Sequence, residues 1–266
     1  MTDSTARLRN LRSWNIGVGG LHLIQGIAIL LISTSFAIPI VATVQTGPPG
    51  APGSLSVSKT FFDFNFAIAI AIFLFLAAGD HLLTSLTPVR AWYERNLLRG
   101  INYARWIEYS VSASIMILLI GLLNGINNFY AMLAIFGLNA AMILFGLVME
   151  QVNRDRESVN WWPFIFGCLA GIIPWIAITI ALVAASTDNT MVDGMPANAD
   201  GVPPFVYGIV ISLFLLFNCF ALNQWLQYRG KGKFTDYLYG EKVYLVLSLV
   251  AKSALAWQIF AGTLAS

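Results

Sequence analysis

The sequence predicts an all-α membrane protein built as a bundle of seven transmembrane helices. Its composition points to the bilayer, because 58% of the residues are hydrophobic and 11% are charged, against about 25% charged in soluble domains. Its length of 266 residues suits about seven crossings of ~20 apolar residues each. A second domain would have no room, so residues 1–266 are predicted to form a single domain.

Apolar windows of membrane length define the seven candidate spans. They cover residues 14–40, 61–86, 100–124, 129–150, 161–185, 203–228 and 241–264. The polar, arginine-bearing start MTDSTARLRNLRSWN has no short apolar core followed by a small-residue cleavage site, so no removable signal peptide is expected. The prediction is a multi-pass integral protein of the cell membrane.

Lysine and arginine concentrate on one side of these spans. The N-terminus and the second, fourth and sixth connections are basic, whereas the alternate connections hold only Lys59. The positive-inside rule therefore places the N-terminus in the cytoplasm and the C-terminus outside. This orientation excludes G-protein-coupled receptors. The first connection is then an outer loop, where GPPGAPG and the alternating SLSVSKT predict a small β-hairpin.

Lys252 is the most informative ionisable residue. It lies in YLVLSLVAKSALAWQIF, eleven residues after Glu241, which at ~1.5 Å per residue puts it near mid-bilayer and too deep to snorkel. A charged lysine there is costly, so it must be neutral, paired or chemically modified. Two interpretations follow: a salt bridge in the bundle core, or a desolvated, nucleophilic amine that forms a Schiff base with an aldehyde.

Glu108 is the leading candidate for the anion that such a nitrogen needs. The apolar run after it, SVSASIMILLIGLLNG, is too short to cross alone, so the third span must extend back and carry Glu108 into the membrane. Polar residues recur at helical spacing on this span and predict one stripe facing the bundle interior. The stripe consists of Asn102, Arg105, Glu108 or Tyr109, and Ser112.

Other polar residues surround the predicted pair. Ser248 precedes Lys252 by one helical turn, where its hydroxyl binds the nitrogen, the carboxylate or its own helix carbonyl. The residues His22, Gln25, His81, Asn102 and Glu108 share the cytoplasmic half and suggest a hydrated cavity. Either histidine is a candidate proton acceptor, or merely bonds across helices. Two histidines are too few for a convincing metal site, so no metal is predicted.

Several segments resemble the heliorhodopsin family over nearly the whole chain. They are GPPG, RWIEYSVSASIMI, LAIFGLNAAMILFG, FGCLAGIIPWI, FVYGIVISLFLLFN and YLVLSLVAKSALAWQIF. A cytoplasmic N-terminus distinguishes this family from ordinary microbial rhodopsins, which run the other way. The resemblance implies retinal bound to Lys252 through a Schiff base, with Glu108 as the sole counterion, Ser248 beside the nitrogen, and His22 and His81 in a polar cytoplasmic cavity.

The resemblance also implies pocket contacts and an assembly. The implied contacts are Tyr109, Ser112, Asn139, Met142, Ile143, Phe217 and Gln224. A homodimer is implied, with the first outer loop as a small β element at its interface, and the Gly167-x-x-x-Gly171 pattern independently permits close helix contact. The chain departs from the family near His81, since Ala77 stands where relatives commonly carry a hydroxyl and Asp80 is an added charge.

These observations predict a light-sensing photoreceptor, not an enzyme. Light would isomerise retinal and send the Schiff-base proton into the cytoplasmic network, with slow return. The outer part of the third span lacks carboxylates, which disfavours pumping. The family resemblance implies sensing or signalling, with the basic loops as the expected contact with an unidentified cytoplasmic partner. No nucleic-acid partner is expected. The alternatives are a light-gated or light-driven proton transporter and a non-photochemical carrier with a core Lys/Glu pair.

Overall fold

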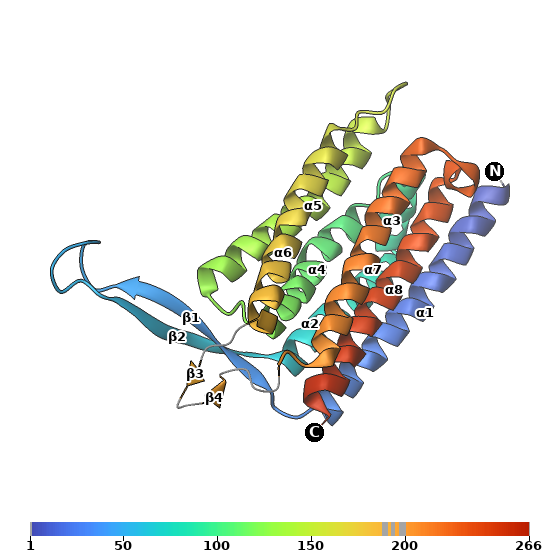
Figure 1. Ribbon diagram of the computed structural model, residues 1–266. Helices are drawn as coiled ribbons and strands as arrows, with labels where there is room; N and C mark the ends of the chain where they lie inside the picture. Colours follow the sequence, from blue (N-terminus) through green and yellow to red (C-terminus); the bar gives the residue numbers. More distant parts are fainter. Residues whose placement is uncertain (1, 188–190, 193–194, 197–200, 266) are drawn as a thin grey trace.

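The computed structural model describes residues 2–187, 191–192, 195–196 and 201–265. Within this part of the chain, seven helices are long and apolar enough to cross a membrane, and they stand side by side in one bundle (Figure 1). They are α1 (Thr2–Ile32), α2 (Phe66–Ser85), α4 (Tyr103–Leu123), α5 (Phe129–Asn153), α6 (Trp162–Thr187), α7 (Pro204–Arg229) and α8 (Tyr237–Ile259).

Shorter elements lie at the two ends of the bundle. One end carries the N-terminus, the short helix α3 (Val89–Leu97) and the 3-10 turn η1 (Gly232–Thr235). We name it the basic end, after the Lys and Arg residues of its connections. The opposite end, the hairpin end, carries β1 (Ala37–Gln45), β2 (Ser56–Asn65), β3 (Met191–Val192), β4 (Met195–Pro196) and the π-helical turn η2 (Phe260–Leu264).

The predicted boundaries of the first two spans were wrong at the hairpin end. The first span was expected to reach residue 40, but α1 ends at Ile32 and residues 37–45 form β1. The second was expected from residue 61, but β2 continues to Asn65, whose side chain caps α2 by accepting a hydrogen bond from the Ile68 N–H. Apolar residues continue from helix into strand in both places, so hydropathy alone does not separate the two.

The predicted β-hairpin is confirmed. Strands β1 and β2 pair antiparallel from Ala37↔Asn65 to Gln45↔Ser56, with an irregularity between Ile40 and Val41. Figure 1 shows the hairpin projecting away from the helices. Its base is held by a hydrogen bond from the Val41 N–H to the carbonyl of Asn127, at 3.0 Å, in the connection between α4 and α5.

The buried interior differs between the two halves of the bundle. In the half toward the hairpin end, one apolar cluster joins residues such as Ile70, Ile120 and Leu255, each with 0% exposure. The half toward the basic end holds most of the buried ionisable side chains among the described residues. These buried residues are His22, His81, Arg105, Glu108, Glu150 and Glu241, with Lys252 near the middle of α8. The buried ionisable side chains are therefore concentrated in one half of the bundle.

Candidate functional site

An ion pair joins α8 to α4 in the bundle interior. The Lys252 Nζ lies 2.8 Å from Oε1 and 3.0 Å from Oε2 of Glu108, and their side chains are 3% and 5% exposed. Nζ also donates to the Ser248 hydroxyl at 3.2 Å and lies 4.9 Å from the ring centroid of Tyr109. Isolated, either charge would be expensive to bury, so the close pairing is what makes both tolerable in this position.

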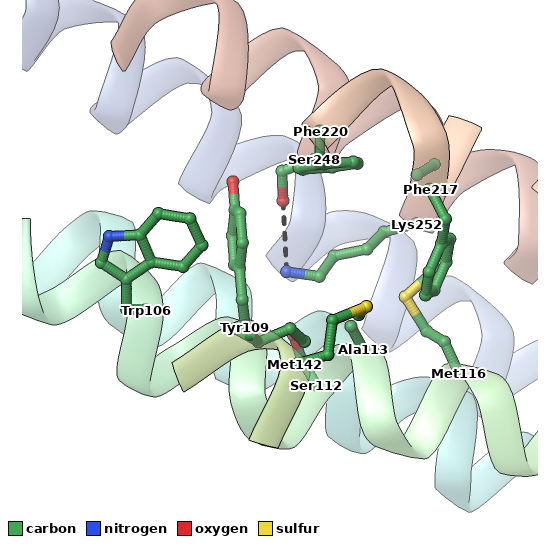
Figure 2. Close-up of a pocket in the computed structure, with 12 residues that line it drawn as sticks. Trp106, Tyr109, Ser112, Ala113, Met116, Met142, Phe217, Phe220, Ser248 and Lys252 are labelled. Carbon is green, nitrogen blue, oxygen red and sulfur yellow. Dashed lines mark hydrogen bonds between the residues drawn. The ribbon is translucent and has the colours of Figure 1, made fainter. Parts of the chain in front are cut away.

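Lys252 stands in the wall of an apolar cavity of about 70 Å³. Figure 2 shows the lysine side chain entering it beside Ser248, with aromatic and methionine side chains around it. The full lining is Trp106, Tyr109, Ser112, Ala113, Met116, Met142, Ile143, Phe217, Phe220, Ser248, Ala251 and Lys252. The Ser112 hydroxyl is buried there with no hydrogen-bond partner among the described residues.

A second cavity, of about 330 Å³, adjoins the first between α4, α5, α6 and α7. The two share Trp106, Met142, Ile143, Phe217 and Phe220 in their walls. The larger one falls within the size range of small-molecule sites, which are mostly apolar with a few placed polar groups. Their combined lining is mostly apolar, with the Lys252 amine in the wall of the first cavity.

The structure brings most of the predicted contact residues to these walls. Lining the first cavity are Lys252, Ser248, Tyr109, Ser112, Met142, Ile143 and Phe217. Gln224 lines the second cavity, and its Nε2 donates to the carbonyl of Gly146 at 3.0 Å. Asn139 lines neither cavity; its Nδ2 donates to the Ser114 hydroxyl at 3.1 Å. It follows that Asn139 acts within the α4–α5 contact.

Sequence reasoning missed part of the lining. Trp106, Ala113, Met116, Phe220 and Ala251 also face the first cavity. Helical spacing from predicted residues was a usable signal: Met116 follows Ser112 by four positions and Phe220 follows Phe217 by three. That signal does not by itself separate cavity walls from ordinary core, because both occupy the inward face of a helix.

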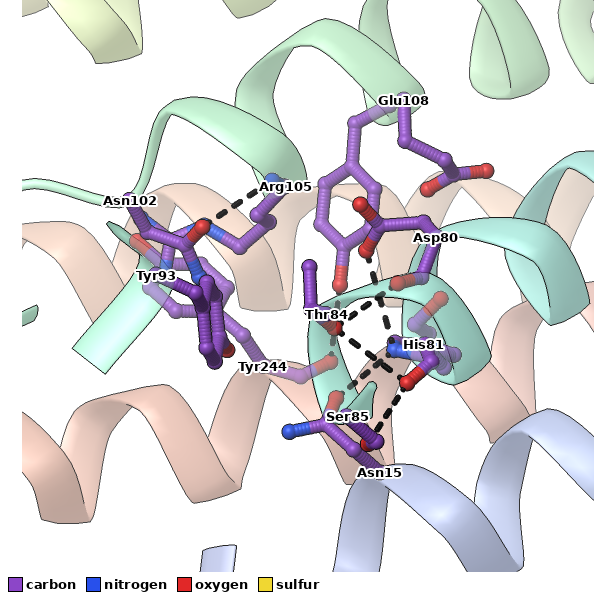
Figure 3. A network of polar contacts seen from close by, with 12 residues as sticks. Asn15, Asp80, His81, Thr84, Ser85, Tyr93, Asn102, Arg105, Glu108 and Tyr244 are labelled. Atoms are coloured by element: carbon purple, nitrogen blue, oxygen red, sulfur yellow. Dashed lines mark hydrogen bonds and ion pairs between the residues drawn. The ribbon is translucent and has the colours of Figure 1, made fainter. Parts of the chain in front are cut away.

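The two histidines lie together beside the ion pair. Their rings stack with centroids 5.9 Å apart. The His81 Nδ1 lies 2.9 Å from Oδ1 of Asn15 (Figure 3). Both ring nitrogens of His22 and Nε2 of His81 are buried without a hydrogen-bond partner among the described residues. Ala77, fully buried one turn before His81, offers no hydroxyl, and Asn15 from α1 supplies the polar contact instead. Asn15 was not predicted.

Of the two other residues predicted in the polar cavity, Gln25 lies elsewhere, whereas Asn102 lines a small polar cavity together with His81. Gln25 is bonded at the contact of α1 with α8, where its Oε1 accepts from Nε1 of Trp257 at 3.1 Å. Trp257 is 38% exposed, so this contact is peripheral. Asn102 is buried, but its side chain caps α4 by accepting from the Arg105 N–H at 3.1 Å, and its Nδ2 donates to Glu241 at 2.6 Å. It therefore joins the polar groups around Arg105 to the cavity that His81 also lines.

That second cluster centres on Arg105 and was missed at the sequence level. Its guanidinium binds Glu150 at 2.6 Å and also binds Glu241, and all three side chains are nearly fully buried. Arg105 was placed on the polar stripe, but its partners sit at the ends of the fifth and eighth helices. Charges at the ends of apolar runs look like loop residues, so hydropathy gave no reason to bury them.

The glycine pair of α6 has a role within the chain. A Cβ on Gly167 would lie 3.3 Å from the carbonyl oxygen of Met142, and one on Gly171 would overlap the Met142 side chain. The small residues therefore let α6 approach α5. The interpretation of Gly167-x-x-x-Gly171 as a hint of dimerisation is accordingly replaced by an intramolecular one.

Comparison with known proteins identifies the chain. No curated protein matches it closely enough to count as a relative. A solved structure titled as a light-driven proton pump LR (Mac) from Leptosphaeria maculans covers 94% of each chain with a TM-score of 0.62 and 15% identity, which shows a shared fold alone. The family model described as Heliorhodopsin matches residues 11–264. Because that match spans most of the sequence, the chain belongs to the heliorhodopsin family.

Proposed function

We propose that this protein is a light sensor in which Lys252 carries retinal and Glu108 is the counterion. The family is one of light-sensing retinal proteins and not of classical enzymes. The observation that supports the residue assignment is the buried Lys252–Glu108 pair, 2.8 Å apart, at the wall of the apolar cavity. An amine in an apolar pocket is the group that condenses with an aldehyde.

The residues of the two cavities fit such a group. Aromatic and methionine side chains would enclose a polyene, while Ser112 and Ser248 provide the few polar contacts near the amine. Joined to Lys252 through a Schiff base, retinal would supply visible absorption and light-driven isomerisation. Met142, Phe217 and Phe220 stand in both cavity walls, so we assign them to holding the chain of the polyene.

Glu108 and Ser248 set the charge state of the Lys252 nitrogen. With the carboxylate at hydrogen-bond distance, a positive nitrogen is stabilised, because an opposite charge within ~4–6 Å favours the charged form. The Ser248 hydroxyl, one turn away on α8, accepts a hydrogen bond from the same nitrogen. In the dark we therefore expect a protonated, coloured pigment.

Among the described residues, buried ionisable groups continue from this nitrogen toward the basic end, whereas buried polar groups toward the hairpin end, such as Ser114 and Asn139, are uncharged. His22 and His81 lie close enough to Lys252 for its charge to act on them. On the other side, Met116 and Ile120 belong to the apolar cluster. We propose that a proton leaving the nitrogen enters the basic-end network and returns from it slowly, so that the light cycle signals without net transport.

The basic end is proposed to face the cytoplasm. Its connections carry nearly all the loop Lys and Arg, including Arg90, Arg95, Lys231 and Lys233, whereas the hairpin end carries Lys59. These basic loops are the proposed contact with a cytoplasmic signalling partner. Nothing in this arrangement requires a nucleic acid.

The hairpin is proposed as the interface of a homodimer in the bilayer. Its surface exposes Leu55 at 64%, Phe61 at 49% and Phe62 at 47%. A two-stranded sheet also leaves strand edges unpaired, which another chain can cover. Replacing Phe61 and Phe62 with Ser should shift the detergent-solubilised protein from dimer to monomer in size-exclusion chromatography with light scattering.

The absorption spectrum of protein expressed with all-trans retinal tests the assignment. We expect a visible band in the wild type and none in Lys252→Ala. The matched control is Lys242→Ala, which removes a half-buried lysine of the same helix that contacts Asn10 and should keep the colour. A colourless wild type, or a coloured Lys252→Ala protein, contradicts the proposal. Steady photocurrents from liposomes would favour a proton transporter over the sensor.

A further inference from the structure

The buried cluster around Arg105 is distinct from the Lys252–Glu108 pair. The Nη2 of Arg105 lies 2.6 Å from Oε1 of Glu150, and Nη1 binds Oε1 of Glu241. The arginine side chain is 4% exposed and each carboxylate side chain is 2% exposed. Further donors reach the carboxylates: the Asn102 N–H and the Tyr237 hydroxyl donate to Glu150 at 2.9 and 3.1 Å, and Asn102 Nδ2 donates to Glu241 at 2.6 Å.

The charges of this cluster do not balance when both glutamates are ionised. Two carboxylates face one guanidinium, which leaves one negative charge in a nearly dry site. The titratable groups that act on it are the phenols of Tyr93, Tyr228, Tyr237 and Tyr244 and the carboxylate of Asp80. None of these adds a positive charge, and the Lys252 charge is taken up by Glu108. One proton shared by the two carboxylates restores neutrality.

A small polar cavity touches the same cluster. It has about 10 Å³ of space, enough for roughly one water molecule, and connects Arg105 and Glu241 with Asp80 and His81. Tyr244, which is 1% exposed, also lines this cavity, and its hydroxyl has no hydrogen-bond partner among the described residues. The Nε of Arg105 is unpartnered in the same way. Buried polar groups around such a space are the usual environment of an ordered water.

We propose that Glu150 and Glu241, bridged by Arg105, form a proton-binding site that holds one proton between them. The proton exchanges with water in the adjoining cavity: the O–H bond of the glutamic acid breaks, the proton passes to the water, and the reverse transfer restores it. Because the cavity reaches His81, the site is coupled to the network beside Lys252. The presence of this proton in the dark does not depend on the proposed function. Its response to light does rest on the proposed function.

Infrared spectroscopy of the full-length wild type tests the dark proton without any substitution. We expect a carboxylic-acid C=O band that shifts when glutamate is labelled with ¹³C at its side-chain carboxyl. Labelling aspartate in the same way should leave this band in place, which separates the site from Asp80. Absence of any glutamate-derived carboxylic-acid band in the wild type overturns the proposal.

Single variants locate the proton. In either Glu150→Gln or Glu241→Gln the remaining carboxylate pairs one-to-one with Arg105, so each substitution alone should abolish the whole band. The matched control is Glu157→Gln, on the exposed 154–161 connection, which should leave the band unchanged. A band that persists in both single variants places the proton elsewhere and overturns the proposal.

Illumination separates this inference from the proposed function. In the retinal-bound wild type we expect the glutamate band to shift on illumination, because charge moves in the network that the cavity connects. In Lys252→Ala we expect the dark band to remain while the light response disappears. If the wild type is colourless but keeps the band, the photoreceptor assignment fails and the proton site stands. If the pigment forms and no glutamate band exists, the photoreceptor assignment stands and the proton site fails.

Discussion

The two halves of the bundle differ in the side chains that fill their buried interior. Toward the hairpin end, α2, α4 and α8 meet through side chains such as Ile70, Ile120 and Leu255 in one apolar cluster. Toward the basic end, the same three helices present His81, Arg105 and Glu241 to one another. Lys252 lies at the border. Among the described residues, the remaining buried carboxylates, Glu150 and Glu241, therefore lie on one side of its nitrogen, which supports the proposed sensor.

The comparison also shows what each half requires. The apolar half needs only close packing, while the polar half needs every charge to have a partner. Glu108 pairs with Lys252, and Arg105 pairs with Glu150 and Glu241. Placing a charge in the apolar half, or removing a charge from the polar half, should therefore be more damaging than a substitution that keeps the character of its half.

Placing a charge in the apolar half should be the most damaging change. Ile120 is fully buried in the apolar cluster, and an aspartate there has no cation to pair with. We expect Ile120→Asp to cost about 3 kcal/mol or more and to reduce pigment yield severely. Ile120→Val should cost about 1 kcal/mol. Yield and thermal bleaching of the two proteins provide the measurement, and equal behaviour would contradict the comparison.

Removing the cation of the polar half should be nearly as severe. Arg105→Gln leaves Glu150 and Glu241 facing each other without compensation, and we expect a loss of about 3–5 kcal/mol. The double substitution Arg105→Gln with Glu241→Gln should recover part of this loss, because only one glutamate then remains in the site without its cation. Thermal bleaching midpoints measure both. A double variant less stable than the single one would argue against charge imbalance as the cause.

Removing the carboxylate beside Lys252 should change the colour more than the stability. In Glu108→Gln the positive nitrogen loses its partner, so we expect a red-shifted or deprotonated pigment. Glu108→Asp keeps the charge and should retain a protonated pigment. Absorption spectra across neutral pH distinguish these outcomes, and a spectrum identical to the wild type in Glu108→Gln would refute the counterion assignment.

Narrowing the cavity should give the smallest effect. A Cβ on Gly171 would overlap the side chain of Met142, which lines both cavities. We expect Gly171→Ala to cost about 1–3 kcal/mol and to slow pigment formation when retinal is added to the apoprotein. Gly137→Ala is the matched control, because no atom lies within 4 Å of a Cβ there. Equal rates of pigment formation would show that α5 and α6 shift apart easily enough to accept the added methyl group.

The sequence was most informative where a residue conflicts with its surroundings. Lys252 and Glu108 are charges inside apolar runs, so depth and helical spacing were enough to predict their pairing across α8 and α4. The burial of Glu150 and Glu241 was not predicted, because charges at the ends of apolar runs are indistinguishable from loop residues in the sequence. The contact of Asn15 with His81 was not predicted either, since it depends on which face of α1 meets α2. The end of α1 and the start of α2 were misplaced because apolar strands continue the apolar helices.

Trp106 offers a way to follow the site without a label. Its ring stands in the wall of both cavities, packed where Gly146 leaves space on α5. A polyene bound there would accept excitation energy from the indole and quench its emission. Although the chain has eight tryptophans, the difference in fluorescence between wild type and Trp106→Phe would isolate this one, giving an optical titration of ligand entry in native membranes.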